Sequence, residues 1–254
     1  MCSSDDSAAI LFDFTAAFPS IEHEFMPKVF QHLSWPHRLL RFIEVLYAFN
    51  TCELAMGGSW QQGFVILRGV RQSCPLSPLL FAVATDALLP RIMRKVPEST
   101  LRAHADDTAL VHQNIWRVLP QIELIFSEFQ SMSGLASNVD KTVFVPLSGE
   151  NLESTRERLA QAAPLWGSMS VARCGKYLGY VIGPCRGVLS WDAPIGKFAK
   201  RARIWGGLGL KTTLACRAFI LSTLLFVCLL DPLPQRALEA EESALKSLFR
   251  EHPG

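Results

Sequence analysis

Two adjacent aspartates, Asp106 and Asp107, stand between two short runs of mostly small or apolar residues in the stretch Leu101–Val111. Aspartate tolerates the backbone geometry of tight turns, so this pattern predicts a β-hairpin that carries both acids at its tip. Neighbouring carboxylates repel each other, and hard divalent cations prefer such oxygen ligands. The hairpin is therefore a candidate edge for holding a metal ion, and an exposed turn is the plain alternative.

A third aspartate, Asp13, favours the metal site. It directly follows the apolar run Ala8–Phe12, which is typical of a buried strand. An acid at the exit of a buried strand is costly unless it is paired or bound to a metal. If this strand lies beside the hairpin, three carboxylates converge, which is enough for two Mg²⁺ ions about 3.5–4 Å apart and in-line phosphoryl transfer. The other pair, Asp5-Asp6, lies in a polar leader and is interpreted as solvated.

The sequence resembles, in order and spacing, five blocks of reverse transcriptases, and among these it is most similar to the polymerases of non-LTR (LINE-type) retrotransposons. The resemblance extends over about residues 8–183 and more loosely to 230. Phe12–Ile21 resembles the first catalytic motif, and Gly69–Phe81 resembles the template-and-nucleotide motif. Ala105–Asp107 matches the catalytic dyad. Residues within Gly134–Thr142 resemble the fourth block, and Lys176–Gly179 resembles the primer-grip block.

The resemblance implies an α+β fold. Residues 1–185 are expected to form a reverse transcriptase palm with part of the fingers, built on an antiparallel sheet flanked by helices. Residues 186–254 are expected to form a helical, thumb-like region. In the family, a fingers region with basic residues for the triphosphate precedes the first motif. Because the chain begins a few residues before that motif, we expect this upstream region to be missing.

The activity implied by the resemblance is RNA-directed DNA polymerisation, in which dNTPs extend a DNA primer on an RNA template. Asp13, Asp106 and Asp107 are the implied catalytic residues. The same carboxylates, with the backbone carbonyl of Phe14, are the implied ligands of two Mg²⁺ ions, for which Mn²⁺ is a substitute. Base pairing, not side chains, selects the nucleotide.

Four residues are implied to contact the incoming nucleotide. Phe18 is expected to lie under the sugar and to exclude a 2′-hydroxyl, although a core phenylalanine is the alternative. Gln72 offers its amide to nucleotide or template, and Arg71 offers its charge to phosphate. Lys141 is expected to assist the leaving pyrophosphate, with an exposed lysine as the alternative. Ser73 departs from the glycine that is usual in the family.

Two segments are expected to bind nucleic acid. The primer-grip block supplies Tyr177, Leu178 and Gly179. Residues 193–230 contain no acid, and a stretch of one charge sign suits a phosphate backbone, with a solvated helix face as the alternative. The basic residues of this stretch are Lys197, Lys200, Arg201, Arg203, Lys211 and Arg217.

Composition adds expectations about compartment. The seven cysteines include no CxxC pair, which argues against a disulfide framework and a zinc finger. The longest apolar run, residues 218–230, is typical of a buried helix and too short for a membrane span. No signal pattern opens the chain. We therefore expect an intracellular protein, in nucleus or cytoplasm, with no membrane partner. The oligomeric state stays open.

The spacing of apolar and turn residues predicts the local structure. A helix over 115–133 should end at Gly134, because glycine commonly closes helices. Strands are expected at 8–14 and 142–147, and hairpins at 51–67 and 174–183. Further helices are expected at 22–33, 36–49, 78–96, 151–163, 193–205, 211–230 and 235–250.

Two other functions remain. The chain is alternatively a catalytically inactive retrotransposon remnant that keeps the palm fold and binds nucleic acid. A metal-dependent nuclease is a third hypothesis, but it leaves Phe18 and the motif Gly69–Pro78 unexplained.

Overall fold

The computed structural model describes residues 6–149, 151–207 and 216–249. The chain divides into two compact units, Met1–Gly175 and Lys176–Gly254, which are described separately here. The functional division predicted between 185 and 186 stays a prediction.

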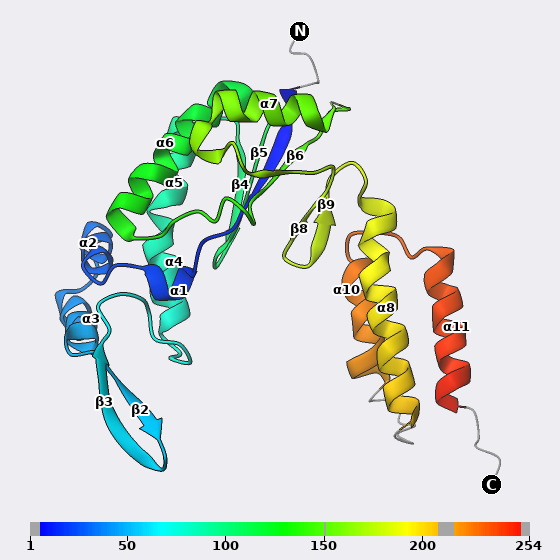
Figure 1. The fold of residues 1–254 in the computed structure, drawn as a ribbon, viewed down its shortest axis with the longest axis horizontal. Coiled ribbons are helices and arrows are strands. Elements are labelled where there is room, and N and C mark those ends of the chain that lie inside the picture. Colours follow the sequence, from blue (N-terminus) through cyan, green and yellow to red (C-terminus); the bar gives the residue numbers. More distant parts are fainter. Residues whose placement is uncertain (1–5, 150, 208–215, 250–254) are drawn as a thin grey trace. The chain divides into compact units, whose positions relative to one another are not determined.

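The first unit is built on a five-stranded sheet. Its central strand β1 (Ala8–Phe12) is buried along its whole length, as expected for five apolar residues in a row. The strand order is β4-β5-β1-β6-β7, and every neighbouring pair is antiparallel except β6–β7. The other strands are β4 (Thr100–His104), β5 (Asp107–His112), β6 (Val143–Pro146) and β7 (Ser170–Val171). Figure 1 shows these strands side by side.

Helices bury one face of this sheet in a common core. Ile10 and Phe12 of β1 join that core, and the Phe12 ring stacks on Phe126 of α6 with 4.4 Å between ring centroids. The helices that contribute most buried residues to this core are α6 (Ile115–Ser133), α2 (Phe25–His32) and α4 (Ser77–Asp86). The remaining helical segments are α1 (Ala17–Ser20), α3 (His37–Ala48), α5 (Leu88–Lys95), α7 (Leu152–Ala162) and the 3₁₀ turn η2 (Pro164–Trp166).

A two-stranded hairpin, β2 (Thr51–Met56) and β3 (Ser59–Val65), extends from α3 (Figure 1). Its turn is Gly57-Gly58, and both glycines adopt positive φ. Neither strand joins the main sheet, and its apolar side chains are open to solvent, with Trp60 74% exposed.

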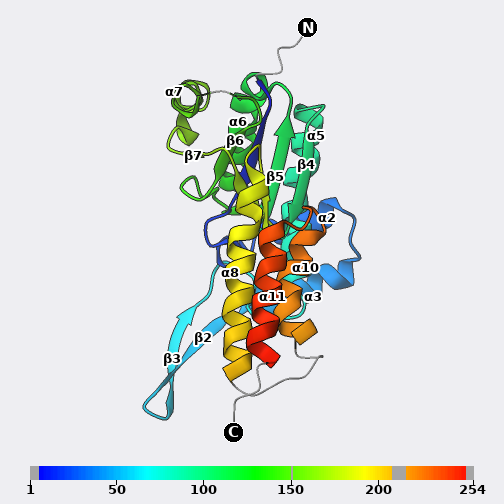
Figure 2. The same cartoon turned by 90° about the vertical axis from the view of Figure 1, so that its right-hand side faces the viewer.

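The second unit has a small hairpin and a helical bundle. The hairpin pairs β8 (Gly175–Tyr177), whose first residue closes the first unit, with β9 (Tyr180–Ile182). The bundle has its own core, which includes Trp191, Phe198 and Leu224. Figure 2 shows α8, α10 and α11 side by side. The helical segments are α8 (Arg186–Gly207), the π-helix η3 (Cys216–Leu221), α10 (Ser222–Cys228) and α11 (Gln235–Phe249).

Several local predictions are confirmed. The helix predicted over 115–133 has those bounds, and Gly134 ends it with φ 76°. The helix predicted over 78–96 is instead two helices that meet at Ala87. The helix start predicted at Ala193 is wrong, because α8 begins at Arg186 and keeps Pro194 inside it. A proline suggests a helix start, yet here the helix continues through it.

Three further findings concern the cysteines, the apolar helices and the basic stretch. Cys174 and Cys185 are disulfide-bonded, against the expectation drawn from cysteine spacing. Within the described ranges, no helix is long and apolar enough to cross a membrane. Lys211, part of the predicted basic helix, lies outside the described residues.

Candidate active site at the end of the central strand

The pairing of β1 with β5 brings Asp13 and the hairpin acids to one end of the sheet. The last paired residues are Phe12 and Thr108, so Asp13 and Asp107 are each the next residue at the same end. Directly opposite residues of antiparallel strands project to the same face. Asp106 lies in the two-residue turn between His104 and Asp107, which pair with each other. The predicted hairpin with acids at its tip is therefore present.

The turn itself is strained. Ala105, its other residue, has φ 53°, a region that residues with a Cβ rarely adopt. Such conformations persist only where the surroundings enforce them, and they cluster at functional sites. The pairing of β4 with β5 on either side enforces this one.

The carboxylates repel one another. The pKa of Asp107 is raised by partial burial, and the negative charges of Asp106 and Asp13 raise it further. His104 acts in the opposite direction. Asp13 also has an uncompensated carboxylate, because its Oδ2 is buried and has no hydrogen-bond partner among the residues that the structure describes. An uncompensated cluster of this kind is stabilised by a cation.

The backbone of Asp13 is held by the segment that leads into β6. The Asp13 N–H donates to Thr142 Oγ1 at 3.3 Å, and the Asn138 N–H donates to the Asp13 carbonyl at 2.8 Å. Thr142, which is fully buried, donates its own hydroxyl proton to the Asn138 carbonyl at 2.8 Å. These contacts fix the strand end that presents the carboxylate. Asn138 and Thr142 belong to the fourth motif of the sequence, but the motif alone indicates no role for either residue.

The carbonyl of Phe14 is turned toward the hairpin side of β1. Phe14 forms an isolated antiparallel bridge with Ser137, and the hydrogen bonds of that bridge use the Asp13 carbonyl and the Thr15 N–H. Carbonyls alternate in direction along an extended strand. The Phe14 carbonyl therefore points away from Ser137, toward the neighbour on the other side, which is β5.

The three carboxylates interact but are not gathered around a single point. Across residues 6–149, 151–207 and 216–249, no three His, Cys, Asp or Glu side chains form a group that could hold a metal ion. The donor set nevertheless fits a hard divalent cation, since it consists of carboxylate and carbonyl oxygens with one orphaned buried oxygen.

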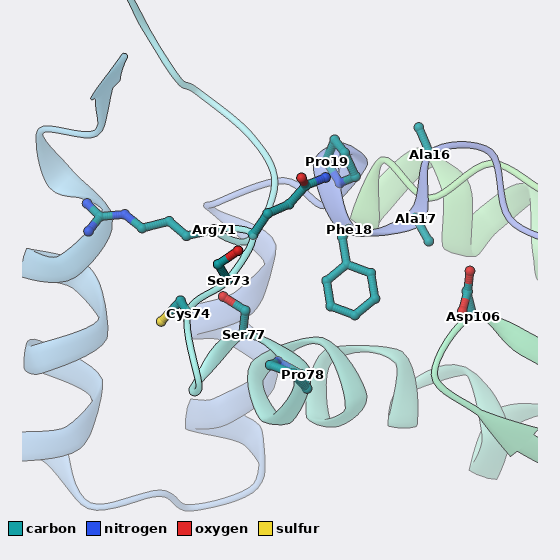
Figure 3. Close-up of a pocket in the computed structure, with 11 residues that line it drawn as sticks. Ala16, Ala17, Phe18, Pro19, Arg71, Ser73, Cys74, Ser77, Pro78 and Asp106 are labelled. Atoms are coloured by element: carbon teal, nitrogen blue, oxygen red, sulfur yellow. The ribbon is translucent and has the colours of Figure 1, made fainter. Parts of the chain in front are cut away.

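A cavity of about 530 Å³ adjoins Asp106. Phe18, Gln72 and Ser77 line it together with Asp106, so part of the first, second and third motifs meet here. Figure 3 shows the Phe18 ring lying between Asp106 and the loop that carries Ser73 and Cys74. The volume of this cavity lies within the range of sites that bind small molecules and cofactors.

Phe18 has contacts that suit both of its predicted roles. Its ring stacks on Phe81 of α4, with centroids 4.5 Å apart, and it also lines the cavity. The short helix α1, which carries Phe18, is fastened to the second motif, because the Val70 N–H donates to the Phe18 carbonyl at 2.8 Å. Gly69 makes this approach possible: a Cβ there would lie 2.7 Å from the Pro19 backbone, and its φ is +89°.

Arg71 lines the cavity, but its guanidinium is engaged elsewhere. Its Nε donates to Asn50 Oδ1 at 3.0 Å, and its Nη2 donates to the Leu46 carbonyl at 2.9 Å. Figure 3 shows the side chain running away from Phe18. Arg71 therefore ties the second motif to the end of α3 in this structure.

Ser73 and Lys141 lie differently with respect to the cavity beside Asp106. Ser73, which replaces the usual glycine, adopts φ 62°, so it occupies the left-handed conformation that glycine prefers. It lines the cavity in spite of its side chain. Lys141 is exposed and does not line this cavity.

In the second unit, the predicted primer-grip residues lie at the tip of the β8–β9 hairpin, where Tyr177 ends β8 and Leu178 and Gly179 form the turn. Leu178 and Gly179 both have positive φ, and Gly179 lies against Phe226 of α10. A cavity of about 300 Å³ is lined by Gly179, Lys197 and Arg201, among other residues. Lys200 and Arg203, on the same helix, are exposed and lie outside the lining of this cavity.

Comparison with known proteins decides the family. The sequence signature described as reverse transcriptase (RNA-dependent DNA polymerase) matches residues 3–182. The chain belongs to the reverse transcriptase family. This reverse transcriptase domain also matches proteins of non-LTR retrotransposons, as the resemblance predicted.

Three relatives illustrate this. The Pol polyprotein of the type-1 element R2 of Popillia japonica is 28% identical over 148 residues, which is 55% of this chain and 21% of the relative. The polyprotein of R2DM from Drosophila melanogaster is 26% identical over 144 residues, 54% and 14% of the two chains. The 149 kDa protein of transposon TX1 from Xenopus laevis is 26% identical over 117 residues, 42% and 9%. The reverse transcriptase domain thus spans about a fifth or less of these relatives.

Solved structures agree on the fold. A Candida tropicalis telomerase in complex with a fragment of telomeric RNA superposes with a TM-score of 0.51 at 13% identity, covering 95% of this chain and 39% of that one. A truncated apo form from the same organism gives 0.50 at 14% identity, covering 70% and 34%. The predicted α+β palm fold with an antiparallel-rich sheet is therefore confirmed.

Proposed function

We propose that this chain is the catalytic core of an RNA-directed DNA polymerase that extends a DNA primer on an RNA template. The observation that carries the proposal is the β1–β5 register, which brings Asp13 beside the Asp106-Asp107 turn at the rim of a cavity. Family membership supports the reaction class. The telomeric RNA bound to one structural neighbour supports RNA as template.

Two Mg²⁺ ions, for which Mn²⁺ is a substitute, are the proposed cofactors. The carboxylates of Asp13, Asp106 and Asp107 and the carbonyl of Phe14 would hold them. When bound, the ions activate the primer 3′-hydroxyl and stabilise the pyrophosphate leaving group. Thr142 and Asn138 act through Asp13, because they hold its backbone in place.

The cavity beside Asp106 is the proposed site of the dNTP. Phe18 limits the space for the sugar, so a 2′-hydroxyl meets the ring edge. Its stacking on Phe81 supports this function, because a ring held from behind cannot swing aside. Gln72 lines the same cavity and offers both a donor and an acceptor. The guanidinium of Arg71 serves the pocket by positioning its loop.

The second unit is proposed to bind the primer–template. Tyr177 ends β8, Leu178 and Gly179 form the tight turn that follows, and Lys197 and Arg201 line the adjoining cavity of that unit. Exposed Lys200 and Arg203 add positive charge on the same helix. Cations arranged in this way neutralise backbone phosphates without reading sequence.

Primer extension tests the proposal. Wild-type protein should extend a DNA primer on an RNA template with dNTPs and Mg²⁺, and Asp106→Asn should abolish extension while the fold stays intact by circular dichroism. Asp86→Asn makes the same charge change at an exposed position on α4 and should extend normally. Equal rates for wild type and Asp106→Asn would remove Asp106 from the site.

A catalytically inactive remnant that binds nucleic acid is the second candidate. The observation that favours it is the spacing of the carboxylates, which within the described residues do not form a three-ligand group. It predicts RNA binding that weakens with salt, and no extension with Mg²⁺ or Mn²⁺ by soluble, folded protein. Extension by the wild type alone would exclude it.

A further inference from the structure

Cys74 occupies a chemically distinctive place in the wall of the cavity beside Asp106. It lines this cavity with Phe18 and Asp106, and it lies three positions before Ser77, the first residue of α4. The chain folds back at this point, because the Ser77 N–H donates to the Cys74 carbonyl at 3.1 Å. The backbone amides of Leu76 and Ser77 are close enough to the Cys74 sulfur to influence its charge. Neither the predicted mechanism nor the proposed metal site uses this thiol.

The surroundings of the sulfur favour a negative charge. The Leu76 N–H is the largest influence that lowers the pKa of Cys74, followed by the Ser77 hydroxyl. The Ser77 N–H and the positive charge of Arg71 lower it further, while burial acts the other way. Cysteines at helix starts beside a cation are typically reactive for this reason, because the thiolate is the nucleophile.

The burial of Ser77 supports the same interpretation. Ser77 is only 2% exposed and lines the cavity, and among the described residues its Oγ has no hydrogen-bond partner other than the Cys74 sulfur that it influences. A buried hydroxyl without any other partner is costly, so it favours an anionic acceptor within reach. Figure 3 shows Ser77 next to Cys74 on the same side of the cavity. A charged sulfur, or a group attached to it, satisfies this donor.

We propose that Cys74 is a reactive thiol to which a small disulfide attaches, and that the adduct obstructs the adjoining nucleotide pocket. The Cys74 sulfur attacks one sulfur of the disulfide, the S–S bond of the small molecule breaks, and a new S–S bond forms on Cys74. The other half leaves as a thiolate and takes a proton from water. A thiol reductant reverses the exchange. The obstruction, unlike the reactivity, rests on the proposed polymerase function.

The protein contains its own reference thiol. Cys228 is free and exposed, and it belongs to the second unit. At a pH below the pKa of a thiol, the fraction of thiolate rises about tenfold for each unit by which that pKa falls. The thiolate also becomes about threefold less nucleophilic per unit, so the net reaction rate rises about threefold. For each unit by which the pKa of Cys74 lies below that of Cys228, Cys74 should therefore react about threefold faster at pH 6–7, after correction for the accessibility of the two sulfurs.

Iodoacetamide labelling, followed by peptide mass spectrometry from pH 6 to 9, measures this directly. The alkylation rate of Cys74 should rise with pH and show its inflection at a lower pH than the rate of Cys228. The accessibility of a sulfur scales its rate but does not move the pH of the inflection. Ser77→Ala, a small change in volume, should move the Cys74 inflection toward that of Cys228. Coincident inflections in the wild type, or no response to Ser77→Ala, would overturn the reactive thiol.

Protection tests the obstruction separately. Labelling of Cys74 by 2-hydroxyethyl disulfide should slow at least about threefold when a primer–template, Mg²⁺ and the next complementary dNTP are present, while Cys228 labelling stays constant. A reactive Cys74 without protection would overturn the obstruction and keep the reactivity. Protection in a protein that extends no primer would contradict the proposed polymerase while the inference stands.

Discussion

At the residue scale, the position of Asp13 in the strand alternation decides to which face of the sheet its carboxylate projects. Ile10 and Phe12 face the helical core, so strand alternation turns Asp13 to the opposite face, where the hairpin acids lie. A shift of one residue would bury the carboxylate among apolar side chains. The apolar run before Asp13 therefore sets the register that serves the site.

Gly69 determines how closely the second motif approaches α1, the short helix that carries Phe18. Gly69→Ala should destabilise the protein by at least about 2 kcal/mol, because the left-handed backbone alone costs a residue with a Cβ about 1–2 kcal/mol and the new methyl overlaps the Pro19 backbone. Urea unfolding measures the loss. Gly58→Ala is the matched control, since Gly58 has φ +80° but no atom within 4 Å of a Cβ. Equal losses would show that Pro19 is irrelevant.

Asp107 should make stability depend on pH. Because its pKa in the folded protein is raised from 3.8, its favourable contribution is full below that pH and is lost as pH rises through the raised value. Asp107→Asn should therefore raise the melting temperature in EDTA at pH 7 by a few degrees at most, and the gain should vanish below about pH 4.

Two controls accompany this measurement. Glu157→Gln removes an exposed carboxylate on α7 and should leave the melting temperature unchanged at both pH values. Mg²⁺ should raise the melting temperature of the wild type more than that of Asp107→Asn, because a bound ligand stabilises the state that binds it. A lower melting temperature for Asp107→Asn in EDTA at pH 7 would contradict the repulsion among the carboxylates.

At the element scale, short-range signals predicted what local chemistry determines. The Asp-Asp turn, the Gly57-Gly58 turn and the helix end at Gly134 all rest on backbone preferences of the residues concerned. Contacts between distant segments were not predictable in this way. The direction of Arg71 depends on Asn50 and the end of α3, and the disulfide bonding of two cysteines depends on how the chain folds.

Helix α8 carries the clearest prediction about an element. Lys197→Gln with Arg201→Gln should weaken RNA–DNA duplex binding and reduce the salt slope of log K by about 1.5–2, if each side chain neutralises one phosphate. Fluorescence anisotropy at several salt concentrations measures both. Lys200→Gln with Arg203→Gln makes the same charge change on α8 outside the cavity and should have a smaller effect. Equal effects of the two pairs would indicate diffuse attraction.

At the scale of the whole molecule, motifs far apart in the sequence meet at one site only because β1 lies between β5 and β6. Ordered blocks predicted the family and the fold, and both are confirmed. The sequence did not reveal that the three carboxylates interact without gathering around one point, because side-chain spacing depends on packing around the turn. The catalytic roles stay proposals that activity must test.

The most direct test is a double-mutant cycle in primer extension with Asp13→Asn, Asp106→Asn and the combined variant. Residues that act as one unit give losses that do not multiply. Each single variant should therefore lose about a thousandfold or more in rate, and the combined variant should lose no more than either. Losses that multiply, or an Asp13→Asn protein that extends at the wild-type rate, would contradict a shared site at the end of β1.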